Sequence, residues 1–312
     1  MAYANFIPEV WNESILRNLE RLCVFAEDCN RQYEGDVKGP GDTVHILGAA
    51  TPQINTINRS LANSDIGEPQ ELEGTDDMLT VNQMAYFNYM VGDIDKAQAV
   101  PALMDSLSAE TSEGIANVID RYIASFAVDE KVPSLYDEAA LVTAEKTDSG
   151  IYVLKVLDDA IQRLYENDVK QNTEIVVTVS PRFYTLFRSA YIDRNTNNSE
   201  IMKNGKVGMY GNVTIKMSNN VCTTNADGEI AKDANGHYTG AIDNIMIRTK
   251  RALAFVNPFT KTEAYRPERH FADAVKGYSL YDAKVIRPQE ILNINVKYTA
   301  DNSNENQNGT DN

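Results

Sequence analysis

Histidine and cysteine are scarce in this sequence of 312 residues, which contains three of each. An odd number of cysteines without a Cys-x-x-Cys pair indicates neither a disulfide framework nor a zinc site. The histidines are scattered, and none has a metal-ligand spacing to another histidine or to a cysteine. Chemistry that depends on clustered histidines is therefore disfavoured, and no metal site is predicted.

Sequence motifs of enzyme active sites are also missing. The sequence contains no GxSxG, P-loop, HExxH or GxGxxG motif. The acidic segments 227–229 and 233–236 lack the oxygen pattern of a calcium loop and are interpreted as hairpin turns. Asp158 and Asp159 are adjacent on an expected helix, so their side chains diverge and cannot act as an acid–base pair. We therefore predict no catalytic residue, no cofactor and no enzymatic activity.

Positive charge is in deficit. The chain has 29 Lys and Arg against 45 Asp and Glu, which gives a net charge of −16. Such a chain repels polyphosphate, so general nucleic-acid binding is disfavoured. No apolar run approaches the ~18 residues of a membrane span, and residues 1–8 lack the basic and apolar regions of a signal peptide. The sequence thus predicts a cytosolic protein with no membrane partner.

The N-terminal third predicts a helix followed by a projecting β-arm. Spacings of three and four between apolar residues indicate an amphipathic helix over residues 10–29. A short strand over 43–47 is separated from a long period-2 strand over 79–91 by an acidic segment with isolated apolar residues. Because this segment is too long for an ordinary loop in a compact domain, we interpret it as the tip of an extended arm.

A long helix is predicted from Pro101 to about Asp129, since proline is tolerated in a first helical turn. At 1.5 Å per residue its length would be ~43 Å, enough to connect two packing regions. Leu107, Ile115, Ile119 and Phe126 are expected to face the core. They belong to one apolar stripe, which consists of Leu103, Leu107, Ile115, Val118, Ile119, Tyr122, Ile123 and Phe126.

Alternating helices and strands in the second half predict an α/β subdomain. Asp148 and Ser149 are expected to cap a helix, a buried strand follows over 174–179, and Ser180 is expected to cap a helix that begins at Pro181. Short strands are expected over 209–217, 245–248, 253–256 and 292–298, whereas the polar tail 299–312 is expected to be disordered.

The order of these parts resembles the HK97-type major capsid protein of tailed double-stranded DNA bacteriophages. An arm, a projecting acidic β-arm, a long helix, an α/β subdomain and closing strands follow one another in the same sequence. Short phrases agree with this resemblance over residues 6–288: Phe6 to Trp11, Tyr33 to Gly35, Gly41 to Val44, Lys250 to Val256, Glu263 to Pro267 and Gly277 to Pro288.

The resemblance implies an α+β, HK97-like phage capsid fold and a structural protein that self-assembles through hexamers and pentamers into an icosahedral shell around double-stranded DNA. It also implies a virion location, with assembly in the host cytoplasm. The implied division is an N-terminal arm (1–35), an E-loop β-arm (36–96), a P-domain with the long spine helix (97–135), mainly an axial A-domain (136–245), closing strands of both domains (246–298) and a disordered tail (299–312).

One departure from the family concerns cross-linking. Some members form a covalent bond through a lysine on the E-loop, but no lysine occurs between Gly39 and Asp95. We therefore expect no isopeptide cross-link. The chain begins almost directly with the arm, which implies a separate scaffolding protein, if one is used, together with a portal; the enclosed DNA would be held without specific binding.

Charge asymmetry suggests which residues join neighbouring subunits. Residues 41–95 carry nine acids and one base, and residues 246–276 carry seven bases and three acids. In the family the E-loop lies across a neighbouring subunit, where such asymmetry would give register and orientation. The candidate inter-subunit residues are Ile54, Ile57, Leu61, Asp65, Glu68, Glu71, Glu73, Asp76 and Asp77 on the arm, with Arg248, Lys250, Arg251, Arg266 and Arg269 on the basic segment.

Two alternatives remain open from the sequence. An encapsulin-like bacterial nanocompartment shell would share the fold but enclose enzymes. A soluble α/β enzyme with an unrecognised site is the other alternative, against which the missing motifs and the long acidic arm both count.

Overall fold

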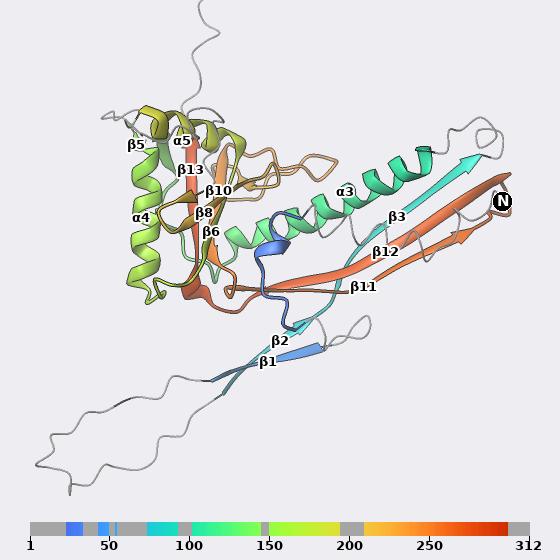
Figure 1. Ribbon diagram of the computed structural model, residues 1–312, viewed down its shortest axis with the longest axis horizontal. Helices are drawn as coiled ribbons and strands as arrows, with labels where there is room; N and C mark the ends of the chain where they lie inside the picture. Colours follow the sequence, from blue (N-terminus) through green and yellow to red (C-terminus); the bar gives the residue numbers. More distant parts are fainter. Residues whose placement is uncertain are drawn as a thin grey trace, which may run out of the picture.

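The computed structural model describes residues 23–33, 43–49, 54, 74–92, 102–144, 150–193 and 209–298. Within these residues the chain forms three sheets and three α-helices, arranged as a body, an elongated extension and a projecting hairpin (Figure 1). The predicted helix before Cys23, most of the tip of the arm and the polar tail lie outside the described residues.

The body is built on an eight-stranded mixed sheet of order β5-β4-β13-β10-β6-β8-β7, with β9 paired to β10. Its centre is apolar: all five residues of β6 are buried, as expected from that segment. The strands are β4 (Ala140–Thr143), β5 (Ile151–Tyr152), β6 (Ile175–Val179), β7 (Met209–Tyr210), β8 (Val213–Met217), β9 (Cys222–Thr224), β10 (Ile242–Thr249) and β13 (Ile291–Tyr298). A short 3₁₀ turn, η6 (Pro288–Glu290), lies directly before β13.

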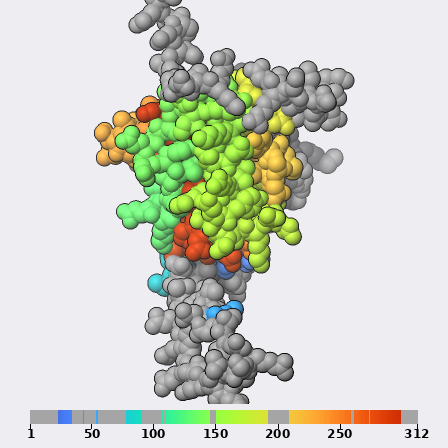
Figure 2. Space-filling model, turned by 90° about the vertical axis from the view of Figure 1, so that its left-hand side faces the viewer, coloured from blue at the N-terminus to red at the C-terminus, as the bar shows by residue number. Residues whose placement is uncertain are grey.

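Two helices pack together beside this sheet, α4 (Val153–Glu166) and α5 (Pro181–Asp193). The apolar side of α4 is buried, and its polar side forms much of the outer surface on that side of the body (Figure 2). The predicted cap of α5 is confirmed, because the Phe183 N–H donates to Ser180 Oγ at 3.2 Å. The predicted start of α4 is wrong: β5 follows the proposed cap, and the helix begins only at Val153.

The extension consists of α3 and a three-stranded antiparallel sheet of order β11-β12-β3. The predicted spine helix is confirmed as α3 (Ala102–Ser125), which η5 (Phe126–Val128) continues. Ile115 and Ile119 are buried as expected, whereas Leu107 and Phe126 are only partly buried. Val118 is 42% exposed, so the buried side of α3 is narrower than the apolar stripe of the sequence. The strands are β3 (Gln83–Gly92), β11 (Leu253–Tyr265) and β12 (Ala272–Val285).

The length of β11 was not evident from the sequence, which indicated a strand only over 253–256. The segment beyond Val256 contains Pro258 and several polar residues. A register shift between Val256 and Phe259 interrupts the β11–β12 ladder at this point, and pairing then resumes through Tyr265. A bulge is where a strand tolerates proline, so the ladder continues past a residue that normally ends it.

The base of the predicted projecting β-arm is an antiparallel hairpin formed by β1 (Thr43–Ala49) and β2 (Gly74–Thr80). The hairpin extends away from the body on the side opposite to the tip of the extension (Figure 1). The single strand predicted over 79–91 is wrong, because it is two strands in different sheets: β2 ends at Thr80 and β3 begins at Gln83.

The end of the predicted helix 10–29 is also wrong. From Cys23 the chain forms bends and a short 3₁₀ turn, η2 (Ala26–Asp28). The carboxylate of Asp120 on α3 accepts the N–H groups of Val24, Phe25 and Ala26 at 2.7, 3.0 and 3.3 Å. Because these donors are directed at a side chain, they do not make the backbone hydrogen bonds of an α-helix.

Candidate functional site

One face of the three-stranded sheet carries large apolar side chains that the chain leaves exposed. Alternate residues of β3 point to opposite faces, and Ala85, Phe87 and Tyr89 lie on the face that α3 covers. On the other face Met84, Tyr86 and Met90 are 55%, 76% and 56% exposed. Large apolar groups concentrated on one exposed surface are typical of interaction sites.

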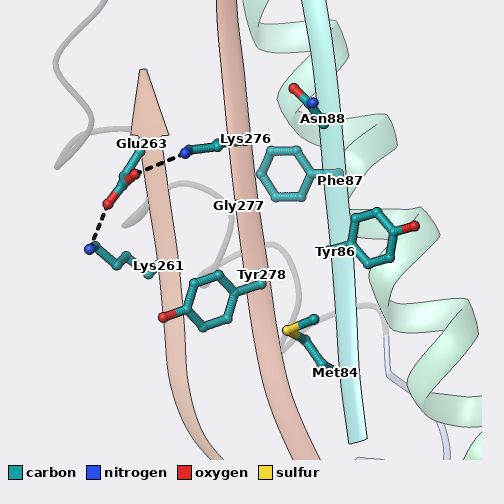
Figure 3. Close-up of a pocket in the computed structure, with 9 residues that line it drawn as sticks. All are labelled: Met84, Tyr86, Phe87, Asn88, Lys261, Glu263, Lys276, Gly277 and Tyr278. Atoms are coloured by element: carbon teal, nitrogen blue, oxygen red, sulfur yellow. Dashed lines mark ion pairs between the residues drawn. The ribbon is translucent and has the colours of Figure 1, made fainter. Parts of the chain in front are cut away.

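Charged residues flank this apolar row on the same face. In the β-ladder Tyr278 lies opposite Tyr86, and Lys276 lies opposite Asn88. The Glu263 carboxylate pairs with Lys261 at 2.6 Å and with Lys276 at 3.5 Å (Figure 3). The hydrogen bond from Lys261 and the positive charge of both lysines hold the pKa of Glu263 below its usual value.

The row and its charged border enclose a shallow hollow of about 360 Å³. Gly277 forms part of its floor, where a Cβ atom would lie 2.5 Å from the Phe87 ring, so this position requires glycine. Apolar groups bordered by charged groups provide area and orientation for binding a protein surface. We name this surface, formed by Met84, Tyr86, Met90, Lys261, Glu263, Lys276 and Tyr278, the open sheet face.

The open sheet face was not predicted from the sequence. The period-2 pattern over 79–91 was recognised from its odd-numbered residues, of which Ala85, Phe87 and Tyr89 lie on the α3 side of β3. The signal was nevertheless present, because residues 84, 86 and 90 of the other row are also large and apolar. A strand that is apolar on both sides must be covered on both sides or be left partly exposed.

Three of the arm residues proposed to contact a neighbour lie within the described part of the chain. Ile54 is 85% exposed, and Asp76 and Asp77 lie in β2 opposite Leu47 and Ile46. The candidates Ile57, Leu61, Asp65, Glu68, Glu71 and Glu73 lie outside the described residues.

Arg248 requires a correction, because it is not a surface base. It is 1% exposed, and its guanidinium donates to the Phe25 carbonyl at 2.7 Å. The same group lies 5.6 Å from the centre of the Phe25 ring. Arg248 therefore holds the N-terminal segment of its own chain and cannot reach a neighbouring arm.

The other candidate bases are divided between the two ends of β11. Lys250 and Arg251 form the turn before it and pair with Glu174 and Glu290 at 3.1 and 3.2 Å. Arg266 and Arg269 lie in the exposed turn after it. At ~3.3 Å per residue the strand separates the two groups by roughly 40 Å. The basic segment is thus two separate surfaces.

The polar groups considered for chemistry have structural partners. Asp158 accepts a hydrogen bond from Tyr210 at 2.9 Å, and Asp159 accepts one from Tyr136 at 3.5 Å. In the described part of the chain no group of three or more His, Cys, Asp or Glu residues could hold a metal ion. Among the helices described, none is long and apolar enough to span a membrane.

Comparison with known proteins identifies the architecture. No protein-family model matches the sequence, and no curated protein matches it. Among solved structures, one from Mycobacterium phage Che8 has a TM-score of 0.65 and 22% identity, and the match covers 87% of this chain and 90% of that chain.

Two further structures are similar over most of their length. The capsid of the cyanophage P-SCSP1u has a TM-score of 0.61 and 12% identity, covering 84% of this chain and 85% of the other. A virus-like particle from Pyrococcus furiosus has a TM-score of 0.53 and 10% identity, covering 92% and 98%. With its mixed sheet, long spine helix and projecting hairpin, the chain has the HK97-like capsid fold.

Proposed function

We propose that this chain is a major capsid protein that self-assembles through hexamers and pentamers into an icosahedral shell enclosing phage double-stranded DNA. The observation that carries the proposal is the hairpin β1–β2, which forms a sheet of its own within the described residues. A two-stranded hairpin is marginally stable alone in water. A neighbouring subunit would supply further contacts to the hairpin, and the capsid fold is consistent with this role.

The proposed role is structural and involves no catalysis. The open sheet face offers apolar area and charged groups for association, and the net charge of −16 disfavours tight contact with the enclosed DNA. We infer that the acids of the arm contact a neighbouring subunit, with Arg266 and Arg269 or Lys250 and Arg251 as the opposing bases. The same proposal includes the division of the chain into arm, E-loop, P-domain and A-domain. It also includes two partners, a separate scaffolding protein and a portal.

Electron microscopy of the purified full-length protein tests the proposal. We expect closed shells built of rings of six and five subunits, formed alone or with a co-expressed scaffolding protein from the same genome. Size-exclusion chromatography with light scattering would give the mass of the particles. A protein that remains monomeric under both conditions would contradict the proposed function and would favour the third possibility, an α/β enzyme.

A nanocompartment shell is a second candidate, favoured by the similarity to the virus-like particle from Pyrococcus furiosus. The contents of shells isolated from cells in which the protein is normally made separate the two functions. Nuclease-protected double-stranded DNA is expected for a capsid, whereas enclosed enzymes without DNA are expected for a nanocompartment.

A further inference from the structure

The projecting hairpin joins the extension at a two-residue hinge, Val81 and Asn82, between β2 and β3. β2 pairs with β1, and β3 pairs with β12. Because the two strands belong to different sheets, no shared β-ladder fixes the direction in which the hairpin leaves the extension. Other contacts must determine that direction.

A small hydrophobic core lies at the hinge and is separate from the main core. Its buried members are Leu79, Val81, Ala254, Val256 and Leu280. This cluster attaches the hinge to β11 and β12. Apolar attraction is not directional, however, so burial alone permits a range of hairpin directions.

Two directional contacts from β12 hold the backbone of the hinge and of the strand before it. The Asn82 N–H donates to Asp282 Oδ2 at 3.1 Å, and Lys284 Nζ donates to the Met78 carbonyl at 2.8 Å. Asp282 and Lys284 are two residues apart, so they lie on the same face of β12. One side chain thus holds the last residue of the hinge, and the other holds the hairpin itself.

Asp282 is in turn fixed by the spine helix. Its other carboxylate oxygen accepts the Tyr122 hydroxyl at 2.8 Å and the Ala283 N–H at 2.7 Å. The residue is 7% exposed, and the Tyr122 ring packs edge-on against Tyr281. Burial and the nearby Asp282 carboxylate raise the pKa of Tyr122 above its usual value, so Tyr122 remains a donor. The hinge is therefore connected through Asp282 to α3.

We propose that Asp282 and Lys284 are positioning residues that set the direction of the projecting hairpin relative to the spine helix. Loss of either contact leaves the hairpin folded and attached through the small core, but lets it swing about Val81 and Asn82. Only the consequence for assembly rests on the proposed function. In a shell, a hairpin without a fixed direction would contact a neighbouring subunit less well.

Distance measurements between two spin labels on unassembled full-length subunits test the proposal. One label is attached at Ala49→Cys, at the far end of β1, and the other at Glu130→Cys, on the exposed surface of the body. The native cysteines Cys23, Cys29 and Cys222 are buried, and burial raises the pKa of the Cys23 thiol to about 12, so selective labelling is feasible.

We expect a narrow distance distribution for the parent and a broader, shifted one for Asp282→Ala and for Lys284→Met. Hydrogen exchange of the Asn82 amide should become at least about tenfold faster in Asp282→Ala, because the amide loses a charge-assisted bond. Asp282→Asn keeps only one of the two acceptor oxygens that its three donors use, so it should narrow the distribution in part relative to Asp282→Ala. Tyr122→Phe, which frees Asp282 from α3, should give an intermediate width.

Lys276→Met is the matched control, since Lys276 is on the same strand but contacts Glu263 on the open sheet face. A purely structural role would lower the unfolding midpoint without changing the distances in the folded protein. Parent-like distributions in folded Asp282→Ala and Lys284→Met would overturn the proposal; if Asp282→Ala does not fold, Lys284→Met and Tyr122→Phe decide. No shell is needed for the measurement, so failure of the parent to assemble would refute the proposed function and leave this result intact.

Discussion

Asp120 and Arg248 are buried charged residues that organise the N-terminal segment. Asp120 is 1% exposed and accepts three backbone N–H groups, while Arg248 binds the Phe25 carbonyl within the same segment. Burial raises the pKa of Asp120 to about 6, although the three N–H donors and the positive charge of Arg248 lower it in part. Desolvation is therefore the larger effect at this site.

The raised pKa predicts a specific pH dependence of stability. Between its ordinary pKa of ~3.9 and the folded value of about 6, Asp120 holds a proton in the folded state that the unfolded state releases. The contribution of this proton to the free energy of unfolding is fully present below pH ~4 and is lost as the pH rises through about 6. The free energy of unfolding changes by up to ~3 kcal/mol over this range.

Urea unfolding of the parent and of Asp120→Asn at several pH values between ~4 and ~7 checks this prediction. The parent should lose stability relative to the variant as the pH rises, and the difference should level off above about 6. Glu130→Gln, at an exposed position, is the control for the removal of one carboxyl group. A constant difference between parent and Asp120→Asn over the whole range would show that the Asp120 pKa is not raised.

At the scale of elements, α3 connects the body to the extension. Its buried residues Ile115, Ile119 and Ile123 belong to the main core, and Tyr122 contacts Phe126 and Tyr281. At 1.5 Å per residue its 24 residues span roughly 36 Å. Damage to its buried side should therefore affect both regions together.

Ile119→Asp tests the assignment of the buried side. Ile119 is 0% exposed, and replacing it removes ~1.5–3 kcal/mol of apolar burial and introduces a charge without a partner. We expect mostly insoluble protein, measured as the soluble fraction after expression. Val118→Asp is the matched control, since the adjacent residue is 42% exposed and should give soluble protein. Assembled shells at normal yield from Ile119→Asp would refute the assignment.

At the scale of the whole molecule, charge is unevenly distributed. The arm segment 41–95 carries −8 of the net −16. Exposed pairs contribute at most ~1 kcal/mol each, but a closed lattice repeats every contact in every subunit. Charge on the arm can therefore influence assembly strongly while influencing the stability of one subunit weakly.

Charge reversal on the arm tests this effect. The combined variant Glu71→Lys, Glu73→Lys, Asp76→Lys and Asp77→Lys should fail to assemble at low salt, as measured by light scattering. Its subunits should still fold, as measured by circular dichroism. A second reversal at Arg266 and Arg269, which lie together in one turn, should partly restore assembly. The same reversal at Lys250 and Arg251 is the comparison, because these bases pair within their own chain. If the arm variant assembles as well as the parent, the arm does not dock electrostatically.

Duplex DNA should not bind to isolated subunits at ~0.15 M salt, because the net charge of −16 repels polyphosphate and the basic side chains are divided between separate surfaces. A filter-binding or anisotropy titration with a labelled duplex measures this directly. Submicromolar affinity in that buffer would contradict the prediction.

Local features of the sequence were sufficient to predict several elements. The apolar stripe predicted α3, and serine followed by proline predicted the start of α5. Short-range patterns determine these features, because a helix and its cap are stabilised by residues within a few positions of one another. The order of such elements was also enough to indicate the HK97-like fold, since that order is a property of the chain itself.

Only the tertiary structure determined the features that depend on distant residues. The segment around Phe25 is not α-helical because Asp120, 95 residues away, binds its N–H groups. The strand pattern over 79–91 divides at Asn82 because Asp282, 200 residues away, accepts its N–H. Arg248 has the sequence context of a surface base but is buried by the Phe25 carbonyl and ring. In each case a polar contact between segments far apart in the sequence overrides the local pattern, because a buried donor or acceptor must be satisfied wherever its partner lies in the chain.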